Sequence, residues 1–244
     1  MPDAFFWEIH SGLDREGPGD EASTRCAFSL LKDLPARPAI LDVGCGPGAQ
    51  TFQLLEMCDG AVTAVDTHQD FLDRLRARGE SLGLAGRIKT LNASMQALPF
   101  PDAYFDLLWS EGAMYMMGFR EGLTQRKRLL KPHGYLAVTE PCWLEPYEEI
   151  PPKAIALWAN DYPGMTSVAH ARSAVRASGY REIDHFVLPT PHGGITTDQR
   201  KPGSRCSGKN IATSRPSSFV SPMRTKKSPR IALIRPIMAT SSSC

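Results

Sequence analysis

Residues 40–51 read ILDVGCGPGAQT and contain the clearest structural signal in the chain. Its first four residues suit a short buried strand, and its last three begin a segment that suits a helix. Between them, Gly44, Gly46 and Gly48 fall within five positions. Glycine has no Cβ and lets another molecule approach the backbone closely, and a helix that begins after such a turn presents N–H groups to it. The stretch therefore predicts a strand, a glycine turn and a helix, with a ligand at the turn.

The next predicted strand indicates which kind of ligand this is. Residues 61–66 read AVTAVD, and Asp66 follows Gly46 by twenty positions. A carboxylate there can accept hydrogen bonds from both hydroxyls of a ribose. Residues 44–49 also satisfy the dinucleotide pattern GxGxxG/A. Asp42, however, disfavours a nearby pyrophosphate and favours a cation, which points to S-adenosylmethionine with its ammonium and sulfonium groups.

Predicted strands and helices alternate along residues 20–189. We expect strands at residues 39–43, 61–66, 87–93, 104–112, 134–140 and 181–189, and helices at 20–34, 49–58, 69–83, 120–130, 146–160 and 167–178. This alternation is typical of α/β proteins in which helices cover both faces of a parallel sheet. The sequence therefore predicts a Rossmann-like, doubly wound, mostly parallel sheet.

Composition places this fold in a single sizeable domain. The chain has 244 residues, of which 42% are hydrophobic, and no apolar run of 18 residues that would suggest a membrane span. The N-terminus has no pattern of a secretory signal. The six cysteines show no CxxC pair and no metal-ligand spacing. We expect free thiols, a cytoplasmic location and no bound metal.

The C-terminal residues differ from the rest. Residues 198–244 hold ten Lys or Arg, one acidic residue and ten serines, and they lack periodicity apart from an apolar run at 231–239. Such a composition buries too little surface to offset its ordering entropy. We therefore divide the chain into a domain of residues 1–197, whose residues 1–35 form a lid and helix, and a basic tail of residues 198–244. The tail is expected to be disordered, or the product of a shifted reading frame.

Four segments together resemble a known family. ILDVGCGPG, the end of VTAVD, NASMQALPFPDAYFDLLWSEGA and LLKPHGYLAVTE are similar, in order, to motifs of the class I S-adenosylmethionine-dependent methyltransferases, and most of all to the branch that acts on small molecules. The resemblance covers roughly residues 1–197. It implies a seven-stranded sheet with a reversed final hairpin and a cofactor over strands one, two and four. The final strand is not recognisable here, so we expect it to be missing or replaced.

The resemblance also implies roles for particular residues. The cofactor-binding candidates are Asp42, Gly44, Cys45, Gly46, Gln50, Thr51, Asp66, Thr67, Ser94, Met95 and Ser110. Glu111 and His10 are the candidate catalytic residues, and Arg15 belongs to the expected lid. The candidate substrate contacts are Met114, Tyr115 and Trp143.

Three functional hypotheses follow. The first is methyl transfer to a small molecule by a monomer or homodimer that binds neither nucleic acid nor membrane. The second is an NAD-dependent oxidoreductase, which rests on the glycine pattern alone. The third is a catalytically impaired remnant that binds the cofactor but has lost its last strand. The sequence names neither the methyl acceptor nor the attacked atom.

Overall fold

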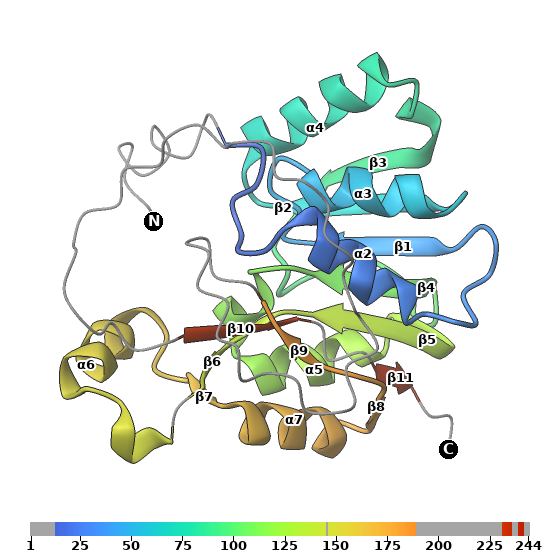
Figure 1. Cartoon of the computed structure of the whole chain (residues 1–244). Coiled ribbons are helices and arrows are strands. Elements are labelled where there is room, and N and C mark those ends of the chain that lie inside the picture. Colours follow the sequence, from blue (N-terminus) through green and yellow to red (C-terminus); the bar gives the residue numbers. More distant parts are fainter. Residues whose placement is uncertain (1–12, 145, 189–230, 236–238, 242–244) are drawn as a thin grey trace.

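The structure of the protein, a computed structural model, describes residues 13–144, 146–188, 231–235 and 239–241 (Figure 1). Its main sheet has seven strands in the order β3, β2, β1, β4, β5, β11, β8. The first five pair in parallel, whereas β11 is antiparallel to β5 and β8. The bounds are β1 (Ala39–Val43), β2 (Ala61–Asp66), β3 (Ile88–Asn92), β4 (Phe105–Ser110), β5 (Leu130–Val138), β8 (Tyr180–Glu182) and β11 (Ala239–Ser241). The predicted doubly wound sheet is confirmed.

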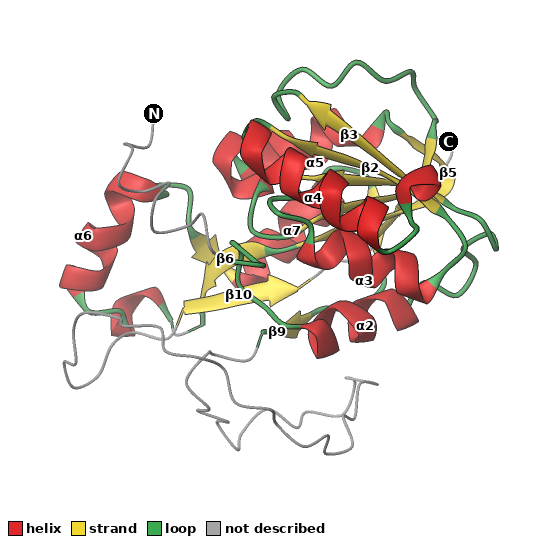
Figure 2. Cartoon of the chain, turned by 90° about the horizontal axis from the view of Figure 1, so that it is seen from above, coloured by secondary structure: helices red, strands yellow, loops and turns green. Residues whose placement is uncertain are grey.

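Alternating residues of the strands build a core on each face of this sheet. Leu41 and Val43 of β1 belong to one core, which α5 (Phe119–Lys127) and α7 (Val168–Ala177) cover. Ile40 belongs to the other core. That core is covered by α2 (Glu21–Ser29), α3 (Ala49–Met57) and α4 (Gln69–Ser81). Figure 2 shows the strands running between these helices.

A second sheet extends from the end of β5. It has four strands in the order β7 (Thr166–Ser167), β6 (Glu140–Trp143), β10 (Ile231–Arg235) and β9 (Phe186–Val187). Beside it lies α6 (Pro152–Asp161), away from the helices of the main sheet in both views (Figures 1 and 2). Three short 3₁₀ helices complete the fold: η1 (Ala85–Arg87), η2 (Met114–Met117) and η3 (Tyr147–Glu149).

Helix α3 begins at a glycine for a packing reason. Gly48 is its N-cap and has a φ of 94°, in the left-handed region that glycine occupies without strain. A Cβ at Gly48 would lie only 2.6 Å from Cδ1 of Leu75 in α4. The third glycine of the turn is therefore required by the contact between α3 and α4, and does not need a ligand to explain it.

Several element predictions are wrong in extent. β5 begins at Leu130, four residues before the predicted strand, and α6 begins at Pro152, six residues after the predicted start of its helix. The helix predicted over residues 20–34 ends at Ser29. The strand predicted over residues 181–189 is divided into β8 and β9, which belong to different sheets. Between them Asp184 accepts a 2.8 Å hydrogen bond from the backbone N–H of His185, and residues 183–185 belong to neither strand.

Two segments of the tail pair with the sheets. β11 lies between β5 and β8, at the position where a replaced final strand was expected. β10 pairs with β6 and β9. The apolar run in the tail therefore contributes strands, which differs from the disorder expected for residues 198–244. Residues 198–230 lie outside the described residues, and the division at residue 197 stays a prediction.

The expectation of six free thiols is wrong for Cys26. Cys26 is disulfide-bonded, whereas Cys45, Cys58 and Cys142 are free. Disulfides are rare in reducing compartments, so one premise for the predicted cytoplasmic location is lost, and that location stays a prediction. Across the described residues, no helix is long and apolar enough to cross a membrane.

Candidate functional site

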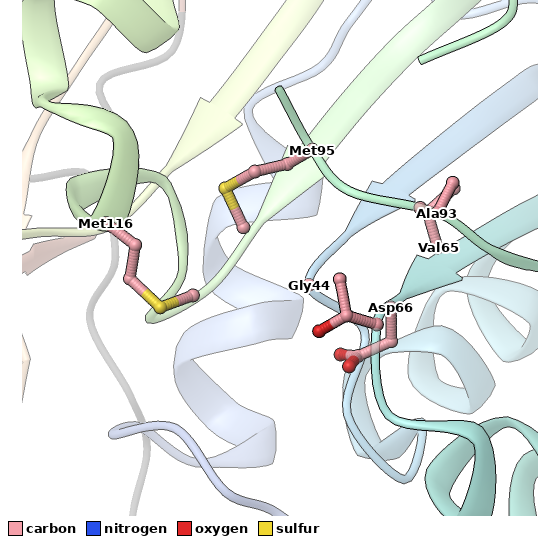
Figure 3. Close-up of a pocket in the computed structure, with 7 residues that line it drawn as sticks. Gly44, Val65, Asp66, Ala93, Met95 and Met116 are labelled. Atoms are coloured by element: carbon pink, nitrogen blue, oxygen red, sulfur yellow. The ribbon is translucent and has the colours of Figure 1, made fainter. Parts of the chain in front are cut away.

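The glycine turn folds over the carboxyl end of β2. The backbone N–H groups of Gly44 and Cys45 both donate to the carbonyl oxygen of Val65, at 2.8 and 3.0 Å. A pocket lies beside this turn, at the carboxyl ends of β1, β2 and β3 (Figure 3). Its lining residues are Gly44, Val65, Asp66, Thr67, Ala93, Met95 and Met116. Ligands of parallel α/β proteins bind at this edge of the sheet.

Gly44 exposes bare backbone to this pocket. Its φ is 70°, and a Cβ there would lie 2.3 Å from Cβ of Ala113. The methyl end of Met95 is 3.8 Å from the same point. No other residue fits at position 44 without displacing its neighbours, which keeps the pocket floor open.

Asp66 is held in place at the pocket edge. One of its oxygens accepts from the N–H of Gly46 and the other from the N–H of His68, each at 2.9 Å. Figure 3 shows the carboxylate beside Gly44, with Met116 across the pocket. Each carboxylate oxygen has a second lone pair, so Asp66 is oriented and can still accept hydrogen bonds from a ligand.

Asp42 lies beneath the turn and is fully buried. It accepts hydrogen bonds from Thr51 Oγ1 at 2.5 Å and from Gln50 Nε2 at 3.4 Å. Burial raises the pKa of Asp42 to about 7; the charges of Glu111 and Asp66 act in the same direction, against these hydrogen bonds. The structure thus places Asp42, Gln50 and Thr51 between β1 and α3, out of the pocket.

The other predicted cofactor residues also fall into two groups, those that line the pocket and those that lie outside it. Thr67 and Met95 line the pocket. Cys45 and Ser110 are buried, and Ser110 Oγ donates to the carbonyl oxygen of Val43 at 3.0 Å. Ser94 is exposed, and its Oγ accepts from the N–H of Gln96. Some predicted cofactor residues thus line the pocket and others are buried behind it, and their contacts with a cofactor stay predictions.

Glu111 is engaged on both oxygens. Arg15 Nη1 donates to Oε2 at 2.5 Å, whereas Thr24 Oγ1 and Trp109 Nε1 donate to Oε1 at 3.1 and 2.9 Å. The Glu111 side chain is 3% exposed. Arg15 also donates to Gln53 Oε1 at 3.0 Å. The structure thus makes Glu111 an anchor for the N-terminal segment. The other catalytic candidate, His10, lies outside the described residues.

Residues 13–18 cross the glycine turn. The side chain of Glu16 lies 3.6 Å from the position of a Cβ at Gly46, and Pro18 packs against Gly112. Arg74 Nη2 donates to the carbonyl oxygen of Leu13 at 2.9 Å. These contacts extend the wall of the site over the end of β4. Sequence reasoning named Arg15 but missed Thr24 and Gln53, whose types and spacing carry no signal.

The candidate substrate residues lie in different surroundings. Met114 is 1% exposed and belongs to the main core, and its predicted substrate contact stays a prediction. Trp143 packs in a small cluster beside α6. The ring of Tyr115 meets the ring of Tyr162 edge-on, with centroids 5.4 Å apart. Met116 is 61% exposed and lines the pocket, although it was not among the predicted substrate contacts.

Comparisons with known proteins support the assignment of this site. Residues 40–134 match the family model described as a methyltransferase domain. A sterol 24-C-methyltransferase of Gibberella zeae is 26% identical over 183 residues, which cover 72% of this chain and 48% of that protein. A 27-O-demethylrifamycin SV methyltransferase of Amycolatopsis mediterranei is 30% identical over 135 residues, covering 53% and 50%. The chain thus spans about half the length of these curated relatives.

Solved structures share the fold. The methyltransferase of Geobacter sulfurreducens, solved in complex with S-adenosylhomocysteine, superposes with a TM-score of 0.66 and 19% identity. The superposition covers 77% of this chain and 74% of that one. At 19% identity this superposition shows a shared fold and nothing more.

Proposed function

The chain belongs to the class I S-adenosylmethionine-dependent methyltransferases, and from this premise we propose that it transfers a methyl group from S-adenosylmethionine to a small organic acceptor. The observation that carries the proposal is the pocket in which the bare backbone of Gly44 faces the oriented carboxylate of Asp66. Both groups lie at the edge of the sheet where ligands of this fold bind.

The lining of the pocket suits a nucleoside cofactor. It combines one carboxylate, the hydroxyl of Thr67 and otherwise apolar or backbone atoms, with no cationic side chain. A carboxylate at this position also binds the ribose of a dinucleotide, so Asp66 alone does not separate S-adenosylmethionine from NAD. The similarity of the chain to methyltransferases favours S-adenosylmethionine.

Particular residues would hold each part of the cofactor. Asp66 would accept hydrogen bonds from the ribose hydroxyls, and Met95 with Ala93 would contact the adenine ring. Gly44 and Gly46 would lie under the amino-acid part. When bound, the cofactor supplies a methyl group on a cationic sulfur, open to attack by a nucleophile.

The chain contributes mainly alignment and exclusion of water. The segment of residues 13–18, fastened through Arg15 to Glu111, covers the site beside the glycine turn. The exposed Met116 offers an apolar surface for the acceptor. Asp42 stabilises the turn from below through Thr51 and Gln50.

The acceptor is proposed only as a class. The relatives are named for transfer to carbon in a sterol and to oxygen in a rifamycin, and the apolar wall at Met116 is in keeping with a largely apolar small molecule. A monomeric or homodimeric state, a cytoplasmic location and the absence of nucleic-acid binding stay predictions.

Calorimetric titration of the purified chain with S-adenosylhomocysteine and with NAD tests the proposal. We expect binding of the first and none of the second. Asp66→Ala removes hydrogen bonds to a charged group, each of which contributes about 1.5–3 kcal/mol, so binding should weaken at least tenfold. Asp59→Ala is the matched control, since Asp59 is exposed in the turn that precedes β2. Equal affinities for the two variants would contradict the proposal.

A further inference from the structure

Glu140 is a buried acid that the proposed cofactor site does not use. It is 1% exposed. The hydroxyl of Tyr162, at the C-terminal end of α6, donates to its Oε1. Its Oε2 is buried and has no hydrogen-bond partner among the described residues. A buried polar atom left unpaired costs stability, so an oxygen of this kind points to a group that pairs with it during function.

Strand register places Glu140 at the same edge of the sheet as the pocket. Asp42 of β1 is level with Trp109 of β4, which is level with Ala137 of β5. The two strand spacings between β1 and β5 amount to roughly 10 Å. Glu140 therefore lies just beyond the carboxyl ends of the strands, about two strands from the glycine turn.

A chain of contacts links this pair to the pocket. The N–H of Gly112 donates to Thr139 Oγ1 at 2.6 Å, which joins the end of β4 to the residue before Glu140. Tyr162 contacts the ring of Tyr115. Tyr115 is followed directly by Met116, which lines the pocket. The pair thus lies against η2, which carries the pocket-lining Met116.

Few ionisable groups act on Glu140 within the part of the chain whose side chains the structure describes. The hydrogen bond from Tyr162 affects the pKa of Glu140, and the charge of Glu140 raises the pKa of Cys142 and of Tyr162. The neighbouring η2 carries only methionines and Tyr115. Among the described residues no Lys, Arg or His forms an ion pair with Glu140. Burial raises the pKa of Glu140 to about 8, and the hydrogen bond from Tyr162 acts against this rise. Such a carboxyl exchanges a proton close to neutral pH, as a general base needs to.

We propose that Glu140 is the residue that accepts the proton of a neutral hydroxyl acceptor, a phenol or alcohol, while Tyr162 orients its carboxylate. This inference rests on the proposed methyl transfer. The acceptor's O–H bond breaks and its proton moves to Oε2 of Glu140. The acceptor oxygen bonds to the methyl carbon, the carbon–sulfur bond breaks, and sulfur keeps the electron pair as a neutral thioether. Water then takes the proton from Glu140, which restores the carboxylate.

The test uses the full chain, S-adenosylmethionine with a radioactive methyl group, and a panel of neutral phenols and alcohols. For the wild type, kcat/KM should rise with pH through about 8, because only ionised Glu140 accepts a proton. Glu140→Gln should lower kcat/KM at least about 100-fold and remove this rise. Tyr162→Phe should move the rise to higher pH, because the bond that lowers the pKa of Glu140 is lost. Glu149→Gln, an exposed site in η3, should match the wild type.

Two readouts do not depend on turnover. Glu140→Gln should bind S-adenosylhomocysteine with the wild-type dissociation constant, within about threefold. The infrared difference spectrum between wild type and Glu140→Gln should show a protonated-carboxyl band that disappears as pH rises through about 8. A wild type that binds no S-adenosylhomocysteine would refute the proposed function itself. Binding without transfer to any hydroxyl compound, or a Glu140→Gln variant with an unchanged pH profile, would overturn only the inference about Glu140.

Discussion

Replacing Gly44 by alanine tests whether bare backbone at the pocket floor is imposed by packing. Two costs arise at this position. A non-glycine residue at a φ of 70° costs roughly 1–2 kcal/mol. The new Cβ would also lie 2.3 Å from Cβ of Ala113, and such overpacking costs about 1–3 kcal/mol. The free energy of unfolding should therefore fall by about 2–5 kcal/mol, measured by urea denaturation.

Gly83 separates the two costs. Its φ is 69°, nearly the same as that of Gly44, but nothing lies within 4 Å of a Cβ built there. Gly83→Ala should therefore show the backbone cost alone. In the Gly44→Ala background, Ala113→Gly removes the colliding methyl group and should recover about 1–3 kcal/mol. Equal losses for Gly44→Ala and Gly83→Ala, or no recovery with Ala113→Gly, would refute the packing argument.

Three further perturbations test other parts of the structure. Glu111→Gln weakens the charged hydrogen bond to Arg15 and should lower the free energy of unfolding by about 2 kcal/mol in urea denaturation. The control Glu56→Gln, in an exposed ion pair, should lower it by less than about 1 kcal/mol. Equal losses would contradict the anchor role of Glu111. Asp42 keeps its proton up to about pH 7 in the folded state but loses it near pH 4 in the unfolded chain. The free energy of unfolding of the wild type, relative to that of Asp42→Asn, should therefore fall between about pH 4 and 7 and then level off. Parallel pH curves for the two proteins would argue against the raised pKa. Thr240→Pro removes an N–H from β11 and should lower the melting temperature, whereas an unchanged melt would argue against pairing of the tail.

The parts of the fold that were predicted correctly depend on local patterns. Residues 40–51 specify a strand, a turn and a helix through apolar residues and glycine, and Asp66 ends the neighbouring strand. Local signals of this kind fix where parallel strands end, and the pocket forms at those ends. They do not tell whether a polar residue faces the pocket or lies beneath it. Asp42 and Ser110, both predicted as cofactor contacts, are fully buried in the structure, and their cofactor contacts stay predictions.

Contacts between distant segments were beyond sequence reasoning. Arg15 meets Glu111 across 96 positions, and Tyr162 meets Glu140 across 22. Neither pair has a spacing that marks it, because the contacts form only when the segment before α2 crosses the sheet edge and α6 lies beside β6. The pairing of β11 between β5 and β8 is equally non-local. Its three residues carry no strand signal apart from their neighbours.

The structure of the chain in complex with S-adenosylhomocysteine tests the central claim most directly. Bound ligand should lie over Gly44, with its ribose hydroxyls within hydrogen-bond distance of the Asp66 carboxylate and its adenine ring against Met95. The sulfur should face the side of the pocket formed by Met116. Ligand bound elsewhere, or a ribose that does not contact Asp66, would contradict the assignment of this pocket as the cofactor site.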